Sequence, residues 1–348
     1  MATFKDDLRD AVTPRAFLLV VGVLLLQLAF VLSYVGAFHS PEPSKIPVAV
    51  VADAQTAPKL AAQLNGIDGK PVSATVIGSE AEAERQIKDN TINAALVVTP
   101  NGTDRLLTSS GAGSSIVGAV QEVFGKAEAQ QGRKMTTQDL VPLQAHDARG
   151  LTGFYLVIGW MVGGYLVASL LGVAGGARPA NPRRAAIRLG SLVPYAVVSG
   201  LGGAIIVDPV LGALTGHFMA LWWLGALIVF AAAAATTALQ VLFGIVGIGA
   251  AVLLFVVLGN PSAGGAFQLH LLPPFWRAIG YILPTGAGTD AVRRIVYFGG
   301  AGIGGHLLTL ALWAVLGTVV AMGAAVALRR KHESAGPEPA TAEPATAD

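Results

Sequence analysis

Five or six apolar stretches, each long enough to cross a bilayer, lie unevenly on either side of one polar segment. The first stretch covers residues 16–38, the polar segment continues to about residue 150, and the remaining stretches follow it. The hydrocarbon core of a bilayer is about 30 Å thick, and an apolar helix of about 20 residues crosses it. This layout predicts an integral membrane protein with one water-soluble domain after its first span.

Composition also indicates lipid as the main solvent. Hydrophobic residues make up 53% of the chain and charged residues 13%, whereas soluble domains contain about 25% charged residues. Mean hydropathy is +0.61. The formal net charge of +2 is too small to indicate a nucleic-acid partner. The absence of cysteine excludes disulfides, thiolate metal sites and cysteine nucleophiles.

The first apolar stretch favours an uncleaved anchor over a signal peptide. It continues from residue 16 to residue 38, whereas the apolar region of a signal peptide is usually about 7–15 residues long. The small residues Gly36 and Ala37 leave cleavage as an alternative. We therefore expect a short cytoplasmic N-terminus at 1–15 and a first transmembrane helix at 16–38.

The polar segment at 39–150 alternates short apolar runs with helical stretches. Strands are expected at 46–51, 72–77 and 94–98, with a possible fourth at 106–109, and helices at 57–64, 79–89 and 115–131. Ser79 and Glu82 match a capping box at the start of the second helix. Strands that alternate with helices predict a small sheet with helices packed on it.

Arginine placement sets the expected orientation through the positive-inside rule. One basic cluster occupies the loop 175–188, and the other follows the last apolar stretch at Arg329, Arg330 and Lys331. With six spans, both clusters and the N-terminus lie in the cytoplasm, whereas five spans would put the clusters on opposite faces. The sequence thus predicts six spans and places the α/β domain outside the cytoplasm.

The predicted fold is a polytopic α-helical membrane protein with six spans and an extracytoplasmic α/β domain between the first and second spans. The last five spans are expected at 151–173, 189–207, 218–239, 241–258 and 307–328, within a transmembrane domain at 151–330. The tail at 331–348 repeats Glu-Pro-Ala-Thr and lacks large apolar residues. Such a segment has no core to bury, so a disordered cytoplasmic tail is expected.

The loop 175–188 is the first candidate for a functional segment. It contains Arg178, Arg183, Arg184 and Arg188. Pro182 with the last three arginines could begin a short basic helix on the cytoplasmic surface. One interpretation is a docking surface for a cytoplasmic partner. The other is a topology signal that holds anionic lipid headgroups.

The second candidate lies before the last span, where two short helices are expected at about 272–298. The first carries Phe275 and Trp276, and the second carries Asp290, Arg293 and Arg294, with Asp290 able to pair with either arginine. Both are too short to cross a bilayer, so they are expected to be re-entrant or interfacial. The alternative is an amphipathic surface helix in an outer loop.

Catalytic motifs are absent from the sequence. It contains no G-x-x-x-x-G-K-[ST] phosphate-binding loop, no H-E-x-x-H and no G-x-S-x-G. The 6 histidines show no metal-ligand spacing. We therefore expect no enzyme activity, no metal and no cofactor in this chain. An intramembrane enzyme is disfavoured because the spans hold no paired acids or Ser/His pair at bilayer depth.

The order of these parts resembles the membrane subunit of type-2 ABC exporters, and most closely the phage-infection-protein (YhgE/Pip-like) branch. The matching segments are IPVAVVAD at 46–53, INAALVVTP at 92–100, GNPSAGG at 259–265 and LPPFWRAIGYILPTGAGTDAVRRIVYF at 272–298. The resemblance implies a permease, usually a dimer of membrane subunits, that works with a separate cytoplasmic ATPase. That partner would bind ATP, the loop 175–188 would contact it, and 272–298 would line the exit side.

The expected function is therefore that of an export permease in the plasma membrane of a bacterial cell, with both termini in the cytoplasm. It would move an amphipathic or lipid-linked substrate outward as a homodimer or a paired permease, in contact with membrane lipid and with no nucleic-acid partner. The alternative is a non-transporting scaffold or receptor whose outer domain binds a cell-surface or secretion partner.

Overall fold

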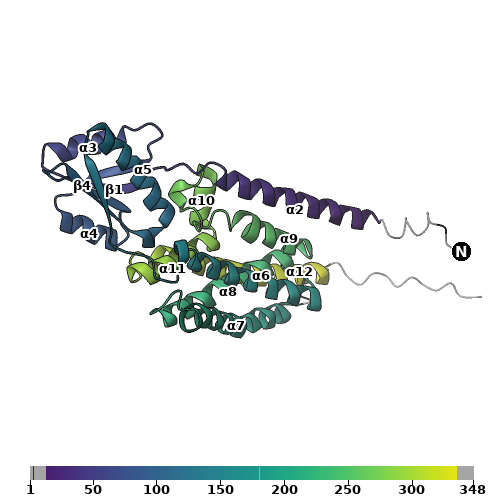
Figure 1. The fold of residues 1–348 in the computed structure, drawn as a ribbon. Coiled ribbons are helices and arrows are strands. Elements are labelled where there is room, and N and C mark those ends of the chain that lie inside the picture. The colour runs from purple at the N-terminus through teal and green to yellow at the C-terminus, as the bar shows by residue number, and fades with distance from the viewer. Residues whose placement is uncertain (1–2, 4–12, 180, 335–348) are drawn as a thin grey trace, which may run out of the picture.

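The computed structural model describes residues 3, 13–179 and 181–334. Figure 1 shows an α/β domain at one end of a bundle of long helices. Most of the expected N-terminal segment at 1–15 and of the tail at 331–348 lies outside the described residues. The last helix, α12 (Gly304–Ser334), continues into the region where the disordered tail was expected to begin.

The α/β domain is built on a sheet with strand order β2-β1-β3-β4-β5. Its strands are β1 (Ile46–Val51), β2 (Val72–Val76), β3 (Ala94–Val97), β4 (Thr103–Thr108) and β5 (Lys134–Asp139). Strand β1 runs parallel to β2 and to β3, β4 is antiparallel to β3, and β5 is parallel to β4. The expected strands at 46–51, 72–77, 94–98 and 106–109 correspond to β1–β4, whereas β5 was not expected.

Three helices cover the two faces of this sheet. Helices α3 (Thr56–Asn65) and α5 (Ser114–Gln130) pack on one face, and α4 (Glu80–Lys88) packs on the other. Alternate residues of β1 point to opposite faces of the sheet. Val48 and Val50 belong to the hydrophobic core beneath α3 and α5, and Ala49 belongs to the core beneath α4. The Ser79 hydroxyl accepts a hydrogen bond of 3.2 Å from the Glu82 amide and caps α4.

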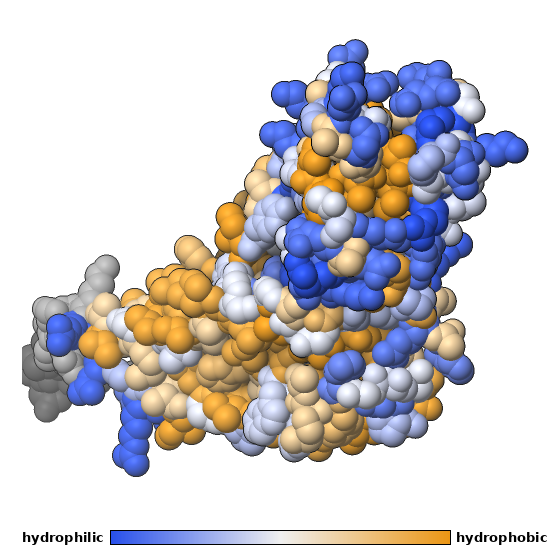
Figure 2. Space-filling view, turned by 90° about the vertical axis from the view of Figure 1, so that its left-hand side faces the viewer, coloured by the Kyte–Doolittle hydropathy of each residue, from blue (hydrophilic) through white to orange (hydrophobic). Residues whose placement is uncertain are grey.

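Within the part of the chain that the structure describes, five helices are long and apolar enough to cross a membrane. They are α2 (Pro14–Phe38), α6 (Thr152–Gly175), α7 (Pro182–Ile205, continued by the π-helical turn η3 at Ile206–Val210), α8 (Phe218–Phe243) and α12. Helix α8 is central and packs against α6, α7 and α12. Figure 2 shows hydrophobic residues over much of the bundle surface and mostly hydrophilic residues on the α/β domain.

Glycine allows α12 and α8 to pack closely in the bundle. Gly317 of α12 is buried against α8, and a Cβ atom there would lie 2.6 Å from the backbone nitrogen of Ala235. Backbones approach this closely only where both helices carry small side chains. This close contact therefore fixes the position of α12 along α8.

The fifth expected span, at 241–258, is not a helix of full length, so the described residues contain five span-length helices where six spans were expected. Helix α8 continues to Phe243, and the chain reverses at Gly244, where φ is +65°. The short helices α9 (Val246–Val252) and η4 (Leu253–Leu258) follow. They rise only about 20 Å together, and the bilayer core is about 30 Å thick. A reversal was expected between 239 and 241, and it lies a few residues later, at Gly244. Hydropathy does not fix its exact position because residues on both sides of Gly244 are apolar.

Two short helices precede α12 and lie at the end of the bundle nearest the α/β domain (Figure 1). Helix α10 (Pro274–Ile282) exposes most of its surface, whereas α11 (Pro284–Phe298) is buried among α6, α8 and α12. Neither helix is long enough to span a membrane. The structure thus contradicts a surface position for α11, because protein surrounds it on most sides.

Candidate functional site

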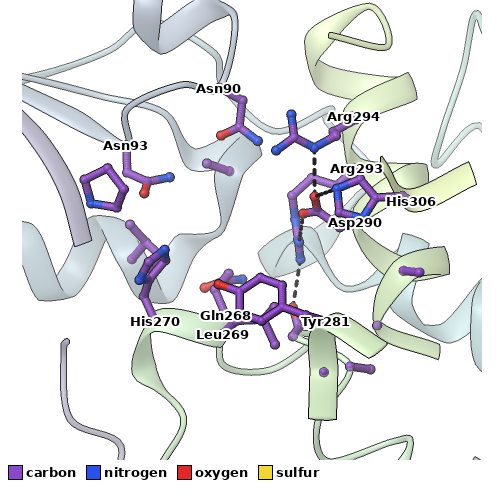
Figure 3. Close-up of a pocket in the computed structure, with 18 of the residues that line it drawn as sticks. Asn90, Asn93, Gln268, Leu269, His270, Tyr281, Asp290, Arg293, Arg294 and His306 are labelled. Atoms are coloured by element: carbon purple, nitrogen blue, oxygen red, sulfur yellow. Dashed lines mark hydrogen bonds and ion pairs between the residues drawn. The ribbon is translucent and has the colours of Figure 1, made fainter. Parts of the chain in front are cut away.

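A polar cavity of about 300 Å³ lies between the α/β domain and the bundle. Its polar lining comes from Asn90 and Asn93 of the domain, Gln268 and His270 before α10, Tyr281 of α10, Asp290, Arg293 and Arg294 of α11, and His306 of α12. Figure 3 shows Arg293, Arg294 and His306 converging on Asp290, with Asn90 and Asn93 on the domain side of the cavity. The cavity therefore brings together residues from both parts of the molecule.

Asp290 is the centre of this cluster. Its Oδ1 atom accepts from Nη1 of Arg293 at 3.1 Å, and its Oδ2 atom accepts from Nε of Arg294 at 2.8 Å. Nε2 of His306 lies 2.9 Å from the same Oδ2 atom. The arginines reach one carboxylate because they follow it by three and four residues on one helical face. His306 comes from α12, so the cluster also joins α11 to α12.

The two arginines also hold two loops, one before α10 and one after α11. Arg293 donates through Nη2 to the Gly264 carbonyl at 2.9 Å, and Arg294 donates through Nη1 to the Ala301 carbonyl at 2.7 Å. Gly264 lies in the turn-rich segment after η4, and Ala301 lies in the loop that leads to α12. The cluster thus fixes the segments that border the cavity as well as its own charges.

The charges of the cluster leave the cavity cationic. Burial raises the pKa of Asp290. The hydrogen bond from His306 and the charges of Arg293 and Arg294 together lower it by more than burial raises it, so the pKa is below the ordinary aspartate value. The carboxylate is therefore ionised at neutral pH. One negative charge faces two guanidinium groups, so the cavity carries a net positive charge even with a neutral histidine.

The linker after α2 is attached to the same region. Nδ1 of His270 lies 3.0 Å from the Ser44 carbonyl, and Nη1 of Arg277 donates to the Ser44 hydroxyl at 2.9 Å. Burial, more than any other influence, lowers the pKa of His270 below the ordinary histidine value. His270 is therefore neutral at pH 7, and the positive charge of the cavity comes from the arginines of α11.

Phe275 and Trp276 of α10 do not line the polar cavity. Their rings pack edge to face with centroids 4.9 Å apart, and the Phe275 side chain is exposed. Trp276 lies near the end of α2, where a Cβ atom on Gly36 would be 3.8 Å from its Nε1 atom. Of the five residues expected on the exit side, the structure brings Asp290, Arg293 and Arg294 together and places the two aromatic residues apart from them.

The arginines of the loop 175–188 fall into two pairs. Arg178 donates to the Val241 and Leu242 carbonyls at 3.2 and 3.0 Å, and Arg188 donates to the Gly176 carbonyl at 2.8 Å. These bonds satisfy carbonyl groups at the ends of α8 and α6. Arg183 and Arg184 are exposed, and neither forms an ion pair with another described residue. This second pair is therefore not tied to the ends of α6 and α8.

The expected separate basic helix in this loop is instead the first part of α7. The Asn181 side chain accepts from the Arg184 amide at 2.9 Å and caps the helix, and Pro182 is its first residue. The helix then continues without a break through the span expected at 189–207. Arg183 and Arg184 are therefore rigidly attached to a membrane helix.

Sequence reasoning did not find the pairing of Asp290 with His306 or the role of Tyr281 in the cavity. The paired residues come from different helices, and no spacing rule links them. Among residues 13–179 and 181–334, no group of three or more His, Cys, Asp or Glu side chains could hold a metal ion. The cavity is thus suited to binding through charge and hydrogen bonds.

Residues 15–148 match the family model described as ABC-2 family transporter protein. The match covers α2 and nearly all of the α/β domain. Comparisons with curated proteins and with solved structures found no match. The family match supports an ABC-2-type permease, a membrane component that normally works with a cytoplasmic ATPase and is generally not an enzyme itself. The more specific assignment to the YhgE/Pip-like branch stays a prediction.

Proposed function

We propose that this chain is the permease subunit of an ABC exporter that moves an amphipathic or lipid-linked substrate outward. The observation that carries the proposal is the family match over α2 and the α/β domain, joined to a bundle with five span-length helices. The sequence contains no phosphate-binding loop. The energy for transport would therefore come from a separate cytoplasmic ATPase.

The proposed topology keeps six crossings, with α9 and η4 as a shortened fifth crossing. Gly244 lies at the end of α8 that Arg178 contacts, and Val257 of η4 accepts a hydrogen bond from Ser33 near the opposite end of α2. The chain therefore returns along much of the bundle between these two residues. Helix α2 begins, and α12 ends, on the side away from the α/β domain (Figure 1). In the proposed topology both termini would lie in the cytoplasm and the domain outside, as the positive-inside rule favours.

The proposed ATPase contact is the turn between α6 and α7, with Arg183 and Arg184 as its exposed charges. Arg178 links this turn to the end of α8, and α8 packs against three of the long helices. Force applied at the turn would therefore reach the centre of the bundle. A second copy of the chain is expected to complete the transporter, because only 6% of the α2 span is buried within one copy.

The proposal can be tested by purifying the full chain from its own host in a mild detergent. We expect an ATP-binding-cassette protein, identified by mass spectrometry, and vanadate-sensitive ATP hydrolysis to co-purify with it. The double variant Arg183→Glu/Arg184→Glu should lose both, and Arg183→Lys/Arg184→Lys should keep both. A matched charge reversal on the α/β domain, Lys59→Glu/Lys134→Glu, should have no effect, because these exposed lysines lie far from the turn.

A second candidate function is a non-transporting scaffold whose outer domain binds a cell-surface or secretion partner. The observation in its favour is an open groove of about 650 Å³ along α3 and α5, lined in part by Leu64, Ile67 and Val123. Absence of any nucleotide-hydrolysing partner in the purified material, with the chain folded and at normal abundance, would favour the scaffold over the permease.

A further inference from the structure

An apolar groove of about 550 Å³ lies beside the polar cavity, on the lipid-facing surface of the bundle. Helices α8, η4, α10 and α12 form it, through residues that include Leu239, Leu254, Ile282, Leu312 and Leu316. The side chains of Ile282, Leu312 and Leu316 are 63%, 49% and 57% exposed. The groove is therefore open to the hydrocarbon that surrounds the bundle.

The groove and the polar cavity meet at Tyr281. This residue lines both spaces, and tyrosine suits such a boundary because its ring is apolar and its hydroxyl is polar. On α12, His306 lines the cavity, and Thr309, three residues later, is the first residue of the helix to line the groove. The polar space thus ends, within one helical turn, where the apolar space begins.

The dimensions of the two spaces match one leaflet of a bilayer. The groove residues of α12 run from Thr309 to Val320, a rise of about 16 Å along the helix axis. Half of a hydrocarbon core about 30 Å thick is about 15 Å. The cavity lies at the end of the groove nearest the α/β domain. A lipid placed there would have its polar end beside the domain and its chain beside α12.

The chemistry of the cavity selects a negatively charged polar end. Arg293 and Arg294 each direct two hydrogen bonds to acceptors among the described residues, and a guanidinium group has further N–H donors. These groups suit the oxygens of a phosphate. Asn90 and Asn93 add amide donors from the α/β domain.

From this juxtaposition we propose that the cavity and the groove form one site for an anionic phospholipid or lipid phosphate, with its charged headgroup beside Arg293 and Arg294 and an acyl chain along α12. The inference rests on the proposed function and names the chemical class of the transported or regulatory lipid. Because the α/β domain contributes Asn90 and Asn93, occupancy of this site would also connect the domain to the bundle.

The test uses the full chain in nanodiscs of phosphatidylcholine. Phosphatidylglycerol with brominated acyl chains is added at increasing mole fraction, and tryptophan fluorescence is recorded. Trp313 lines the groove, so its contribution is isolated by subtracting the signal of Trp313→Phe. We expect brominated phosphatidylglycerol to quench Trp313 at a mole fraction about tenfold lower than brominated phosphatidylcholine. Both headgroups carry a phosphate that can accept from arginine, but phosphatidylcholine also carries a choline cation, which the positively charged cavity repels. Equal quenching by the two lipids would overturn the proposal.

Variants separate the two halves of the site. Arg294→Gln should abolish the preference for phosphatidylglycerol, and Arg294→Lys should retain part of it. Leu316→Phe should narrow the groove and weaken quenching by phosphatidylglycerol, whereas Leu308→Phe, on an exposed residue of α12 outside the groove, should not. If Leu316→Phe had no effect, or if soluble glycerol phosphate displaced the lipid, the groove would not be part of the site.

Failure of this inference can be distinguished from failure of the proposed function. If the ATPase co-purifies but Trp313 shows no lipid preference, the permease assignment holds and the lipid site is wrong. If the lipid preference is present but no ATPase is found, the site holds and the permease assignment is wrong. Each variant is compared at equal size-exclusion behaviour, and the Leu316 and Leu308 pair tests the groove without altering the ion cluster.

Discussion

Tyr297 donates a hydrogen bond of 2.5 Å from its phenol to the Asp147 carboxylate, and this bond attaches α11 to the segment between the α/β domain and α6. The other oxygen of Asp147 accepts from the Thr152 amide at 2.8 Å, at the start of α6. Tyr297 also packs on the domain, because a Cβ atom on Gly111 would lie 2.9 Å from its own Cβ. One side chain therefore contacts the domain, the linker and the helix that carries the ion cluster.

Tyr297→Phe is expected to weaken this attachment while leaving the ring in place. The variant removes the phenol that donates to the buried Asp147 carboxylate. The free energy of unfolding should fall by about 1–3 kcal/mol. Thermal unfolding of the purified chain in detergent measures the loss. Tyr195→Phe is the control, because that hydroxyl makes a longer bond of 3.3 Å at an exposed site. Equal melting temperatures for the two variants would contradict the prediction.

Asp290→Asn is expected to leave two guanidinium groups and His306 facing one another without a carboxylate. Because the Asp290 side chain is 25% exposed, solvent screens part of the repulsion, and the cost should be about 1–3 kcal/mol. The melting temperature in detergent measures it. Asp208→Asn is the matched control, since Asp208 forms no ion pair with any residue that the structure describes. A control as destabilised as Asp290→Asn would contradict this account.

The stabilisation by Asp290 also has an expected pH dependence. Its pKa in the folded protein is below the ordinary aspartate value, so the folded state favours the ionised form. The stabilisation should therefore be fully present above the ordinary aspartate pKa and be lost only as the pH falls through the lowered value. In wild type the melting temperature should fall in strong acid, and in Asp290→Asn this part of the fall should be absent.

A buried acidic pair should make the α/β domain less stable as the pH rises from acid to neutral. Arg133 donates to Asp104 at 2.6 Å, and its Nε lies 3.7 Å from Glu128. Burial, followed by the neighbouring Asp104, raises the pKa of Glu128 from 4.5 to about 7. A raised carboxyl pKa means that the folded state binds the proton more tightly, so stability should fall as the pH rises from about 4.5 through about 7. The loss is at most about 3 kcal/mol.

Glu128→Gln should remove this dependence. Its amide cannot ionise, so the first thermal transition of the variant should change little between about pH 5 and about pH 8, whereas that of the wild type should move to lower temperature. Glu122→Gln is the control, because Glu122 lies on the same helix, is exposed and pairs with Lys126. A variant that still loses stability over this range would show that another group is responsible.

Gly317→Ala should separate α12 from α8. The added Cβ would meet the α8 backbone at Ala235, and overpacking at such a contact costs about 1–3 kcal/mol. Gly323→Ala, six residues further along α12, adds a methyl group where no atom lies within 4 Å. That control should be neutral or slightly stabilising, because alanine favours helix more than glycine does. Melting temperatures in detergent measure both effects. A Gly317→Ala variant as stable as Gly323→Ala would show the prediction to be wrong.

Local patterns in the sequence predicted most of the fold. Apolar strands such as Ile46–Val51 and the capped start of α4 at Ser79 follow from local patterns, and so do the long apolar helices. Strand β5, at Lys134–Asp139, was missed because it is a polar, largely exposed edge strand and has no apolar alternation. Its place depends on pairing with β4, which is a tertiary interaction that local reasoning cannot reach.

The candidate site was only partly predictable for a similar reason. The pairing of Asp290 with Arg293 and Arg294 follows from helical spacing along one segment. The contact with His306 depends on how α11 and α12 pack, and the cavity depends on how the α/β domain sits on the bundle. The reversal between the spans expected at 218–239 and 241–258 was predicted, but it lies at Gly244 rather than near residue 240, because an uninterrupted apolar run does not mark the residue at which it turns back.

The sparse packing of α2 has a practical consequence for handling the protein. Its outward side chains, such as Leu18, Val20 and Leu32, are 68%, 67% and 75% exposed, so neighbouring molecules must shield them. Detergent that removes bound lipid would expose this apolar surface to water while the other long helices stay packed together. Aggregation during purification should therefore begin through α2, and milder micelles or added phospholipid should suppress it.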